Sequence, residues 1–158
     1  IQIDNIRKYG PEKIGSIIIY SSELKGINIP EKYIANAIDE FPILFIAAAN
    51  ASGKTILKNA MELRFKESDR LASMSKGLLK CNINNTLLDD GIEIEGGKIS
   101  GATIDSYDDH RIAMSFAIAG IASSSTITIL NTENVSTSFP GFDNLMRKMG
   151  LKIKRENI

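Results

Sequence analysis

Two short charged segments contain the residue types that anion binding and proton transfer require. They are residues 66–70 (KESDR) and 108–111 (DDHR), and each lies just ahead of an apolar helical pattern. The N-terminus of a helix favours anions, because its N–H groups lack partners and its dipole is positive there. Arginine adds paired hydrogen bonds to a carboxylate or phosphate. We therefore expect a site that binds anions and moves protons.

Other helix starts extend this pattern. Asp39 precedes a third apolar stretch, and Thr137 with Ser138 precedes a fourth. If the helices are parallel, their four N-termini point toward one opening. Asp39 and Glu67 would then be carboxylates among cations, placed for general acid or base catalysis.

Each residue also has an ordinary structural explanation. Asp and Ser before a helix are usually caps. Glu67 and Arg70 are three apart, a spacing common in solvated helix pairs that contribute a few tenths of a kcal/mol. His110 is the single histidine, and a lone histidine is more often structural than catalytic. Only their recurrence at equivalent places favours a site.

Composition excludes several function classes. The 158 residues include nineteen basic and nineteen acidic side chains, so no overall field favours nucleic acid or an anionic membrane as a partner. The most apolar stretch, residues 41–49, is too short to span a bilayer. The single cysteine excludes an internal disulfide, and a reducing cytoplasmic location fits.

Hydrophobic periodicity predicts alternating strands and helices. The expected strands are 14–20, 55–57, short antiparallel strands within 87–100, 126–130 and 151–153. The expected helices are a short one in 31–37, then 39–51 capped by Asp39, 69–81 capped by Ser68, 109–121 capped by Asp108 or Asp109, and 138–150 starting at Ser138. Leu71, Met74, Leu78 and Leu79 form the expected apolar face of the helix at 69–81.

These elements repeat with a period near 70 residues. The matching pairs are Asp39 with Asp109, Thr55 with Thr126, Lys80 with Lys148, and Asn82 with Gly150. Asn and Gly both tolerate the left-handed conformation that ends a helix. The period predicts two copies of one helix–strand–helix–strand unit.

The charged segments also resemble a known family. Residues 66–70 and 109–114 closely resemble signature segments of the 5-enolpyruvylshikimate-3-phosphate synthases. Residues 37–42 and 138–142 match further segments in the right order and spacing, and 24–27 match a weaker one. The resemblance covers nearly the whole chain and its first two motifs are highly specific.

The resemblance implies an α/β (α+β) enolpyruvyl transferase fold. This is an inside-out domain of repeated βαβαββ units, with parallel helices buried inside and mixed sheets outside. The apolar helices at 43–51 and 112–121 support it, because they need burial on every face. We expect residues 1–158 to be a partial C-terminal domain with units at about 14–100 and 101–158, lacking the N-terminal domain of the same enzyme.

The resemblance further implies transfer of the enolpyruvyl group of phosphoenolpyruvate to the 5-hydroxyl of shikimate 3-phosphate, without a metal or redox cofactor. By motif position, the resemblance implies that Asp39 is the proton acceptor and that Glu67 exchanges a proton with the methylene. It also implies that Lys66 lies on the shikimate-phosphate side, that Arg70 and Arg111 bind phosphoenolpyruvate, and that His110 is a supporting neighbour.

Some positions depart from the family, and two alternatives stay open. Thr137 stands where some members have lysine, and Glu62 where some have asparagine. The alternatives are the sister enzyme that acts on a UDP-sugar (UDP-N-acetylglucosamine), against which residues 66–70 argue, and a non-catalytic ligand-binding domain. Closure of two domains excludes water in such enzymes, so we expect the chain alone to lack useful turnover.

Overall fold

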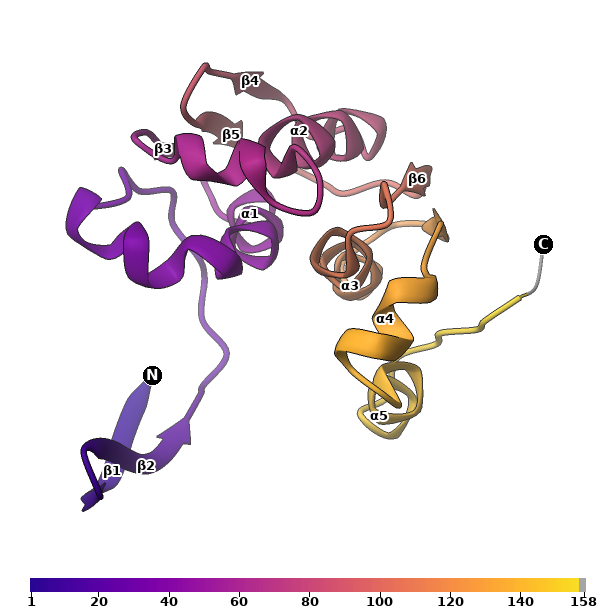
Figure 1. Cartoon of the computed structure of the whole chain (residues 1–158). Coiled ribbons are helices and arrows are strands. Elements are labelled where there is room, and N and C mark those ends of the chain that lie inside the picture. The colour runs from indigo at the N-terminus through magenta and orange to yellow at the C-terminus, as the bar shows by residue number, and fades with distance from the viewer. Residues whose placement is uncertain (157–158) are drawn as a thin grey trace.

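Three helices pack against one another at the centre of the molecule. They are α1 (Phe41–Ala49), α2 (Arg70–Lys80) and α3 (His110–Ala119). The computed structural model describes residues 1–156 and is drawn in Figure 1. Phe45 of α1 and Phe116 of α3 are fully buried in the shared core, as their apolar runs require.

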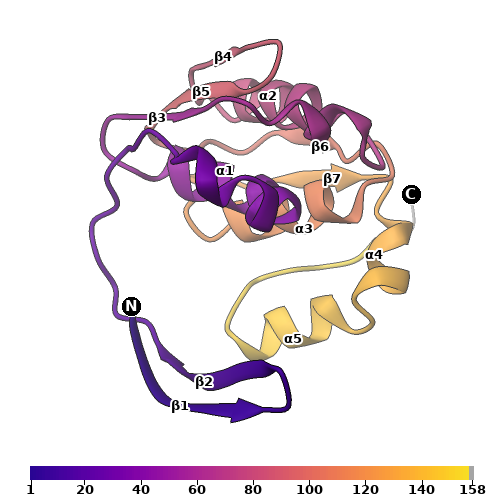
Figure 2. The ribbon, with the colours of Figure 1, turned by 60° about the vertical axis from the view of Figure 1, so that its left-hand side comes forward.

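Two small sheets lie outside these helices (Figure 2). The first is antiparallel, in the order β3 (Lys54–Leu57), β5 (Ile92–Glu95), β4 (Asn85–Leu87). The second pairs β6 (Thr103–Asp105) with β7 (Thr128–Leu130) in parallel. Inward-facing side chains alternate with outward-facing ones along β5, so the sheet covers the helices with one face and meets solvent with the other. The helices are therefore inside and the sheets outside.

The chain passes twice through the same order of elements. Residues 24–29 run parallel to residues 52–56, and α1 connects the two segments. In the same way α3 connects the parallel strands β6 and β7. A short helix and a longer helix follow each time, first η3 (Met61–Phe65) and α2, then α4 (Glu133–Ser138) and α5 (Phe142–Lys148).

A hairpin of β1 (Gln2–Tyr9) and β2 (Glu12–Ile18) precedes this body and lies apart from it in Figure 1. Two 3₁₀ helices, η1 (Glu31–Tyr33) and η2 (Ala35–Glu40), lead into α1. No helix within residues 1–156 is long and apolar enough to cross a membrane.

Several predicted elements are confirmed. The helix expected at 69–81 is α2, and its Leu71, Met74 and Leu78 are buried. The antiparallel strands expected within 87–100 include β5, although β4 begins earlier, at Asn85. Asn82 and Gly150 both adopt the left-handed conformation expected after a helix.

The prediction of a helix starting at Ser138 is wrong, since Ser138 is the last residue of α4. Pro140 disfavours helical backbone at Phe139, whose φ of −141° and ψ of 80° are not helical, and Gly141 then turns the chain in the left-handed region before α5. The strand predicted at 151–153 is absent, because those residues have no partner strand in the described part of the chain.

Burial of the helices is less complete than expected. Leu44 on α1 and Leu79 on α2 are about half exposed, contrary to the prediction that these helix faces are buried. Leu79 borders the space between α2 and β6, so neighbouring residues cover it only in part. The strand predicted at 14–20 is β2, two residues earlier, and β1 was not predicted because its alternation of apolar and polar residues is weak.

Candidate active site

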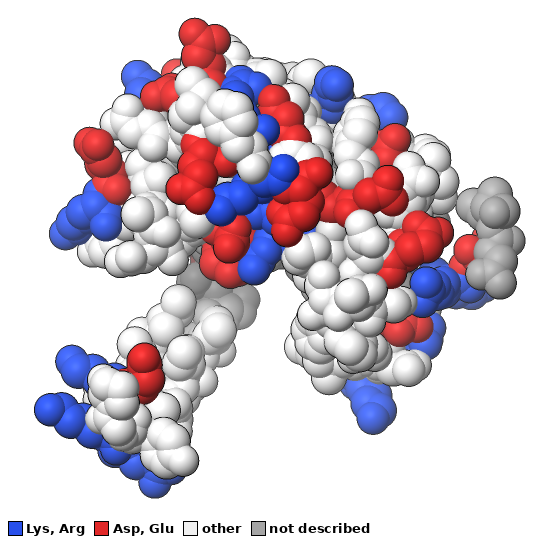
Figure 3. Space-filling view, viewed as in Figure 1, with Lys and Arg blue, Asp and Glu red and all other residues white. Residues whose placement is uncertain are grey.

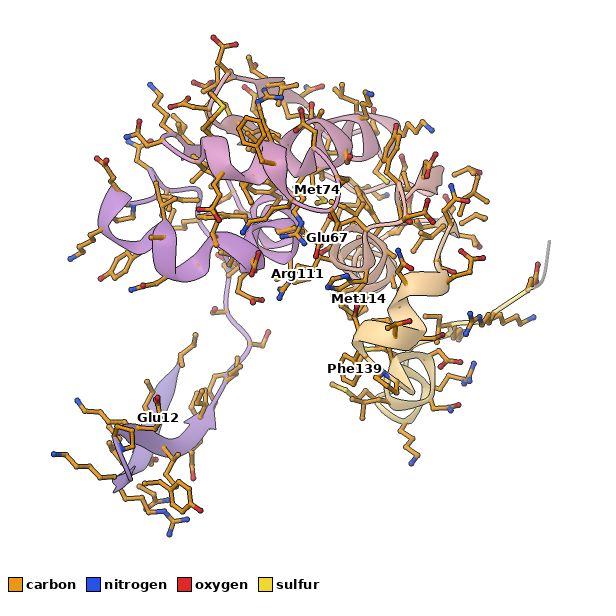
Figure 4. The ribbon with its side chains drawn as sticks, viewed as in Figure 1. Glu12, Glu67, Met74, Arg111, Met114 and Phe139 are labelled. Carbon is orange, nitrogen blue, oxygen red and sulfur yellow. The ribbon has the colours of Figure 1, made fainter. Side chains whose placement is uncertain are left out.

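The N-terminal ends of α1, α2 and α3 meet at one face of the molecule, where acidic and basic side chains interleave (Figure 3). Figure 4 shows Glu67 and Arg111 near each other at this place, whereas Phe139 lies away from them beside α4 and α5. Residues far apart in sequence therefore form one group. We call its members the mouth cluster: Asp39, Glu40, Lys66, Glu67, Arg70, Asp109 and Arg111.

Arg70 is the centre of the mouth cluster and donates to three carboxylates. Its Nε donates to Asp109 Oδ2 at 2.9 Å, its Nη1 to Asp39 Oδ1 at 2.9 Å and its Nη2 to Glu67 Oε2 at 2.6 Å. The Arg70 side chain is only 1% exposed. Burial acts to lower the pKa of Arg70, but the hydrogen bond and charge of Asp109, with the other carboxylates, raise it overall. The guanidinium is therefore permanently charged.

Asp109 caps α3 and also reaches α2. Its Oδ1 accepts the backbone N–H of Arg111 at 2.9 Å, as the sequence predicts for an N-cap. Its Oδ2 accepts from Ser68 Oγ at 3.1 Å and from Arg70. The side chain has no exposure to solvent. This contact between helices was not predicted, because the capping pattern explains Asp109 without it.

Arg111 is the second residue of α3 and is held more loosely than Arg70. Its Nη1 donates to the carbonyl oxygen of Asp39 at 2.8 Å and to Glu40 Oε1 at 3.0 Å. The side chains of Arg111 and Glu40 are 30% and 59% exposed. An exposed pair of this kind contributes little to stability, so Arg111 can exchange its partner.

Lys66 adds a third cation beside Asp39. Its Nζ lies 3.5 Å from Asp39 Oδ1 and 2.6 Å from Glu62 Oε1. The hydrogen bond to Glu62 is the main cause that raises the pKa of Lys66. Partial burial acts to raise the pKa of Asp39, but the hydrogen bond from Arg70 and the charges of Lys66 and Arg111 lower it below its usual value. Asp39 is therefore ionised at neutral pH.

Two predicted caps are wrong. Asp39 lies inside η2, which runs directly into α1, so its carboxylate faces Lys66 and Arg70 instead of a free N–H group. Ser68 gives its hydroxyl to Asp109, and the following residue, Asp69, accepts from the backbone of Ala72 as the true cap of α2.

The remaining predicted residues lie beside or away from the mouth cluster. His110 is the first residue of α3 and is partly buried. Thr137 lies near the C-terminal end of α4, so the expected fourth helix start is not part of the site. The sequence therefore predicted four converging helix starts, and three of them meet.

The mouth cluster is filled by its own ion pairs. A cleft of about 230 Å³ lies elsewhere, between α2 and β6, and is lined by residues that include Lys76, Lys80 and Tyr107. Three cations of the mouth cluster, Lys66, Arg70 and Arg111, already have carboxylate partners. An anionic ligand would thus bind by replacing carboxylates. Only the exposed carboxylates can be replaced at a small cost in free energy, because water solvates them once they separate.

Curated proteins similar in sequence to this chain carry the same name. A 3-phosphoshikimate 1-carboxyvinyltransferase of Legionella pneumophila is 54% identical over 142 residues, which are 90% of this chain and 33% of that protein. A protein of the same name from Coxiella burnetii is 46% identical over 98% of this chain and 35% of its own length. The chain thus spans about a third of the curated relatives it matches.

The solved structures agree. A structure of EPSP synthase from Acinetobacter baumannii has a TM-score of 0.94 and 49% sequence identity, covering 99% of this chain and 37% of that one. The helices inside and sheets outside are therefore the α/β enolpyruvyl transferase fold that the resemblance implied. The family model of EPSP synthase (3-phosphoshikimate 1-carboxyvinyltransferase) matches residues 7–156. Sequence, fold and relatives together show that this chain belongs to the EPSP synthase family.

Proposed function

We propose that the chain supplies one wall of an enzyme that transfers the enolpyruvyl group of phosphoenolpyruvate to the 5-hydroxyl of shikimate 3-phosphate, releasing phosphate. One observation carries the proposal: two exposed carboxylates, Asp39 and Glu67, lie among three cations where three helix N-termini meet. Two anionic substrates require the cations, and a reaction that removes one proton and adds another requires the carboxylates.

Asp39 accepts the proton of the substrate hydroxyl in this proposal. Its lowered pKa keeps it ionised, and Lys66 at 3.5 Å sets the place of its carboxylate. A carboxylate with a low pKa is a weak base. Bound phosphate groups would offset the charges of Lys66 and Arg70, and so raise the pKa of Asp39 toward the value that proton transfer needs.

Glu67 exchanges a proton with the methylene carbon. When the hydroxyl oxygen bonds to the enol carbon, the methylene gains a proton and becomes a methyl group. When phosphate leaves, the methyl group gives a proton back and the double bond forms again. Glu67 is about half exposed and bonded to Arg70 at 2.6 Å, so it lies at the open side of the mouth cluster, where a substrate can reach it.

Arg70 and Arg111 bind the anionic groups of phosphoenolpyruvate, and His110, directly before Arg111 in α3, supports them. Lys66 binds shikimate 3-phosphate on its phosphate side. We also propose that residues 14–100 and 101–158 are two repeat units of a C-terminal domain, whose N-terminal partner domain completes the site. The two passes through the same order of elements support this division.

The test is an assay of the complete enzyme with phosphoenolpyruvate and either shikimate 3-phosphate or UDP-N-acetylglucosamine. We expect phosphate release and an enolpyruvyl product, detected by mass spectrometry, with shikimate 3-phosphate only. Turnover with the UDP-sugar alone, or with neither acceptor, would overturn the proposal. The 158-residue chain assayed by itself should show no useful turnover, and appreciable transfer would contradict the shared-site part.

A further inference from the structure

Asp109 is a buried ionisable side chain to which the proposed function gives no role. Its two oxygens bond to two different helices. Oδ2 accepts from Arg70 Nε and Ser68 Oγ at the start of α2, and Oδ1 accepts the backbone N–H of Arg111 in α3. One carboxylate thus connects the N-terminal ends that carry the two arginines.

The three carboxylates on Arg70 differ in how easily they can leave. Asp39 and Glu67 are 46% and 51% exposed, so water can solvate either one when it separates from Arg70. Asp109 is fully buried, and separating it from Arg70 would leave its buried negative charge without the cation that compensates it. Asp109 is therefore the fixed partner, and the other two are exchangeable.

The turn before Asp109 is built to hold it in place. Tyr107 and Asp108 both have positive φ, 54° and 56°, a conformation that costs free energy for residues other than glycine. The carboxylate of Asp105 accepts the N–H of Tyr107 at 2.8 Å, and Ser106, which is fully buried, donates its hydroxyl to the carbonyl of Asn131. The loop after β7 thus holds the turn from outside the mouth cluster.

From this geometry we infer that Asp109 is a positioning residue: it holds the guanidinium of Arg70 and the start of α3 at a fixed separation while a bound anion replaces Glu67 or Asp39. Arg70 has five N–H groups, and Asp109 takes the inner one, at Nε. The outer groups, on Nη1 and Nη2, are those that the exchangeable carboxylates occupy. The inference rests on the proposed function, because phosphoenolpyruvate is the anion.

The test compares Asp109→Asn with wild type in the complete enzyme. Asparagine keeps an oxygen acceptor and the side-chain shape but removes the charge. We expect KM for phosphoenolpyruvate to rise about 10–100-fold, the size of a charged hydrogen bond, while KM for shikimate 3-phosphate changes by less than about threefold. Ser68→Ala removes one weaker bond to the same oxygen and should raise KM for phosphoenolpyruvate by about two- to fivefold.

A second background separates positioning from loss of fold. If Asp109 acts through Arg70, adding Asp109→Asn to an Arg70→Lys enzyme should raise KM for phosphoenolpyruvate by less than about threefold over Arg70→Lys alone. Fully additive losses, or equal rises in both KM values, would overturn the inference. Asp143→Asn, which removes a partly exposed ion pair on α5, is the control and should match wild type. A wild-type enzyme without transfer activity would instead refute the proposed function, whereas an active Asp109→Asn enzyme with wild-type KM values refutes this inference alone.

Discussion

The starts of α2 and α3 carry the same kind of cation but hold it in opposite ways. Arg70 is buried and bonded to three carboxylates, one of which is fully buried. Arg111 is partly exposed and bonded to a carbonyl and to an exposed carboxylate. Arginines near the starts of two packed helices therefore give one fixed and one adaptable cation.

The difference is explained by which helix supplies the buried anion. Asp109 caps α3, so its own helix receives a backbone bond, and its remaining oxygen is directed to α2. Asp69, the cap of α2, is instead partly exposed and pairs with Arg64, away from α3. A site that binds an anion gains from such asymmetry, because one cation fixes the geometry and the other adjusts to the ligand.

The largest effect should come from removing the fixed cation. Arg70→Met leaves Asp109 buried without its charge partner, and we expect it to lower the free energy of unfolding by about 3–5 kcal/mol. Arg111→Met removes only an exposed pair and should cost less than about 1 kcal/mol. Urea unfolding of the 158-residue chain measures both. Equal losses of unfolding free energy in the two variants would show that Arg70 and Arg111 are held equally firmly.

A change in the spacing between α2 and α3 should have the next largest effect. A Cβ added at Gly77 of α2 would lie 2.2 Å from the ring of Phe116, which is fully buried in α3. Gly77→Ala should therefore force the helices apart and cost about 1–3 kcal/mol in urea unfolding.

The matched control is Gly97→Ala, where the added atom meets its nearest neighbour at 3.5 Å, an ordinary contact. The complete enzyme with Gly77→Ala should also lose affinity for phosphoenolpyruvate, since Arg70 and Arg111 move relative to each other. Unchanged stability in Gly77→Ala would mean that the contact between the helices is loose.

Removing the charge of Asp39, an exposed partner of Arg70, should have a smaller effect on the free energy of unfolding, and this effect should depend on pH. Because the pKa of Asp39 is lower in the folded chain than its ordinary value of 3.8, the ionised group stabilises the fold above that value. The contribution is lost as pH falls through the folded pKa. Asp39→Asn should thus lower the free energy of unfolding by well under about 1 kcal/mol at pH 7, because the pair is exposed to solvent, and by less near pH 2.

Urea unfolding of wild type and Asp39→Asn at both pH values tests this sign. A difference between the two proteins that grows on acidification would contradict the lowered pKa of Asp39.

The smallest effect should come from the exchangeable partner of Arg111. Glu40→Gln removes an exposed ion pair and should change the free energy of unfolding by about 0.2–1 kcal/mol at most. In the complete enzyme it should lower KM for phosphoenolpyruvate about twofold at low salt, since a competing carboxylate is gone, and less at high salt. A large rise in KM would instead mean that Glu40 holds Arg111 in place.

Local patterns in the sequence were enough to predict α2, α3 and the cap of α3, but not the cap of α2. The apolar spacing of Leu71, Met74 and Leu78 specifies the buried face of α2, and Asp109 before an apolar run specifies the start of α3. The meeting of Asp39, Glu67 and both arginines followed from the repeat and the resemblance, because parallel helices bring their starts together.

Contacts between distant residues could not be predicted. Ser68 and Asp109 are 41 positions apart, and each has a sufficient local explanation as a cap. The left-handed Tyr107 and Asp108 give no sequence signal, since the loop after β7 holds the turn. The sequence could have shown that no helix runs through Phe139, because Pro140 disfavours helical backbone at the residue before it.

The most direct test is a crystal structure of the complete enzyme with shikimate 3-phosphate and phosphoenolpyruvate bound. We predict that Arg70 Nε stays within hydrogen-bond distance of Asp109, while Glu67 or Asp39 leaves the outer N–H groups of Arg70 to the ligand and Glu40 leaves Arg111. A complex in which Arg70 separates from Asp109 to reach the ligand, or in which neither arginine contacts it, would contradict the account.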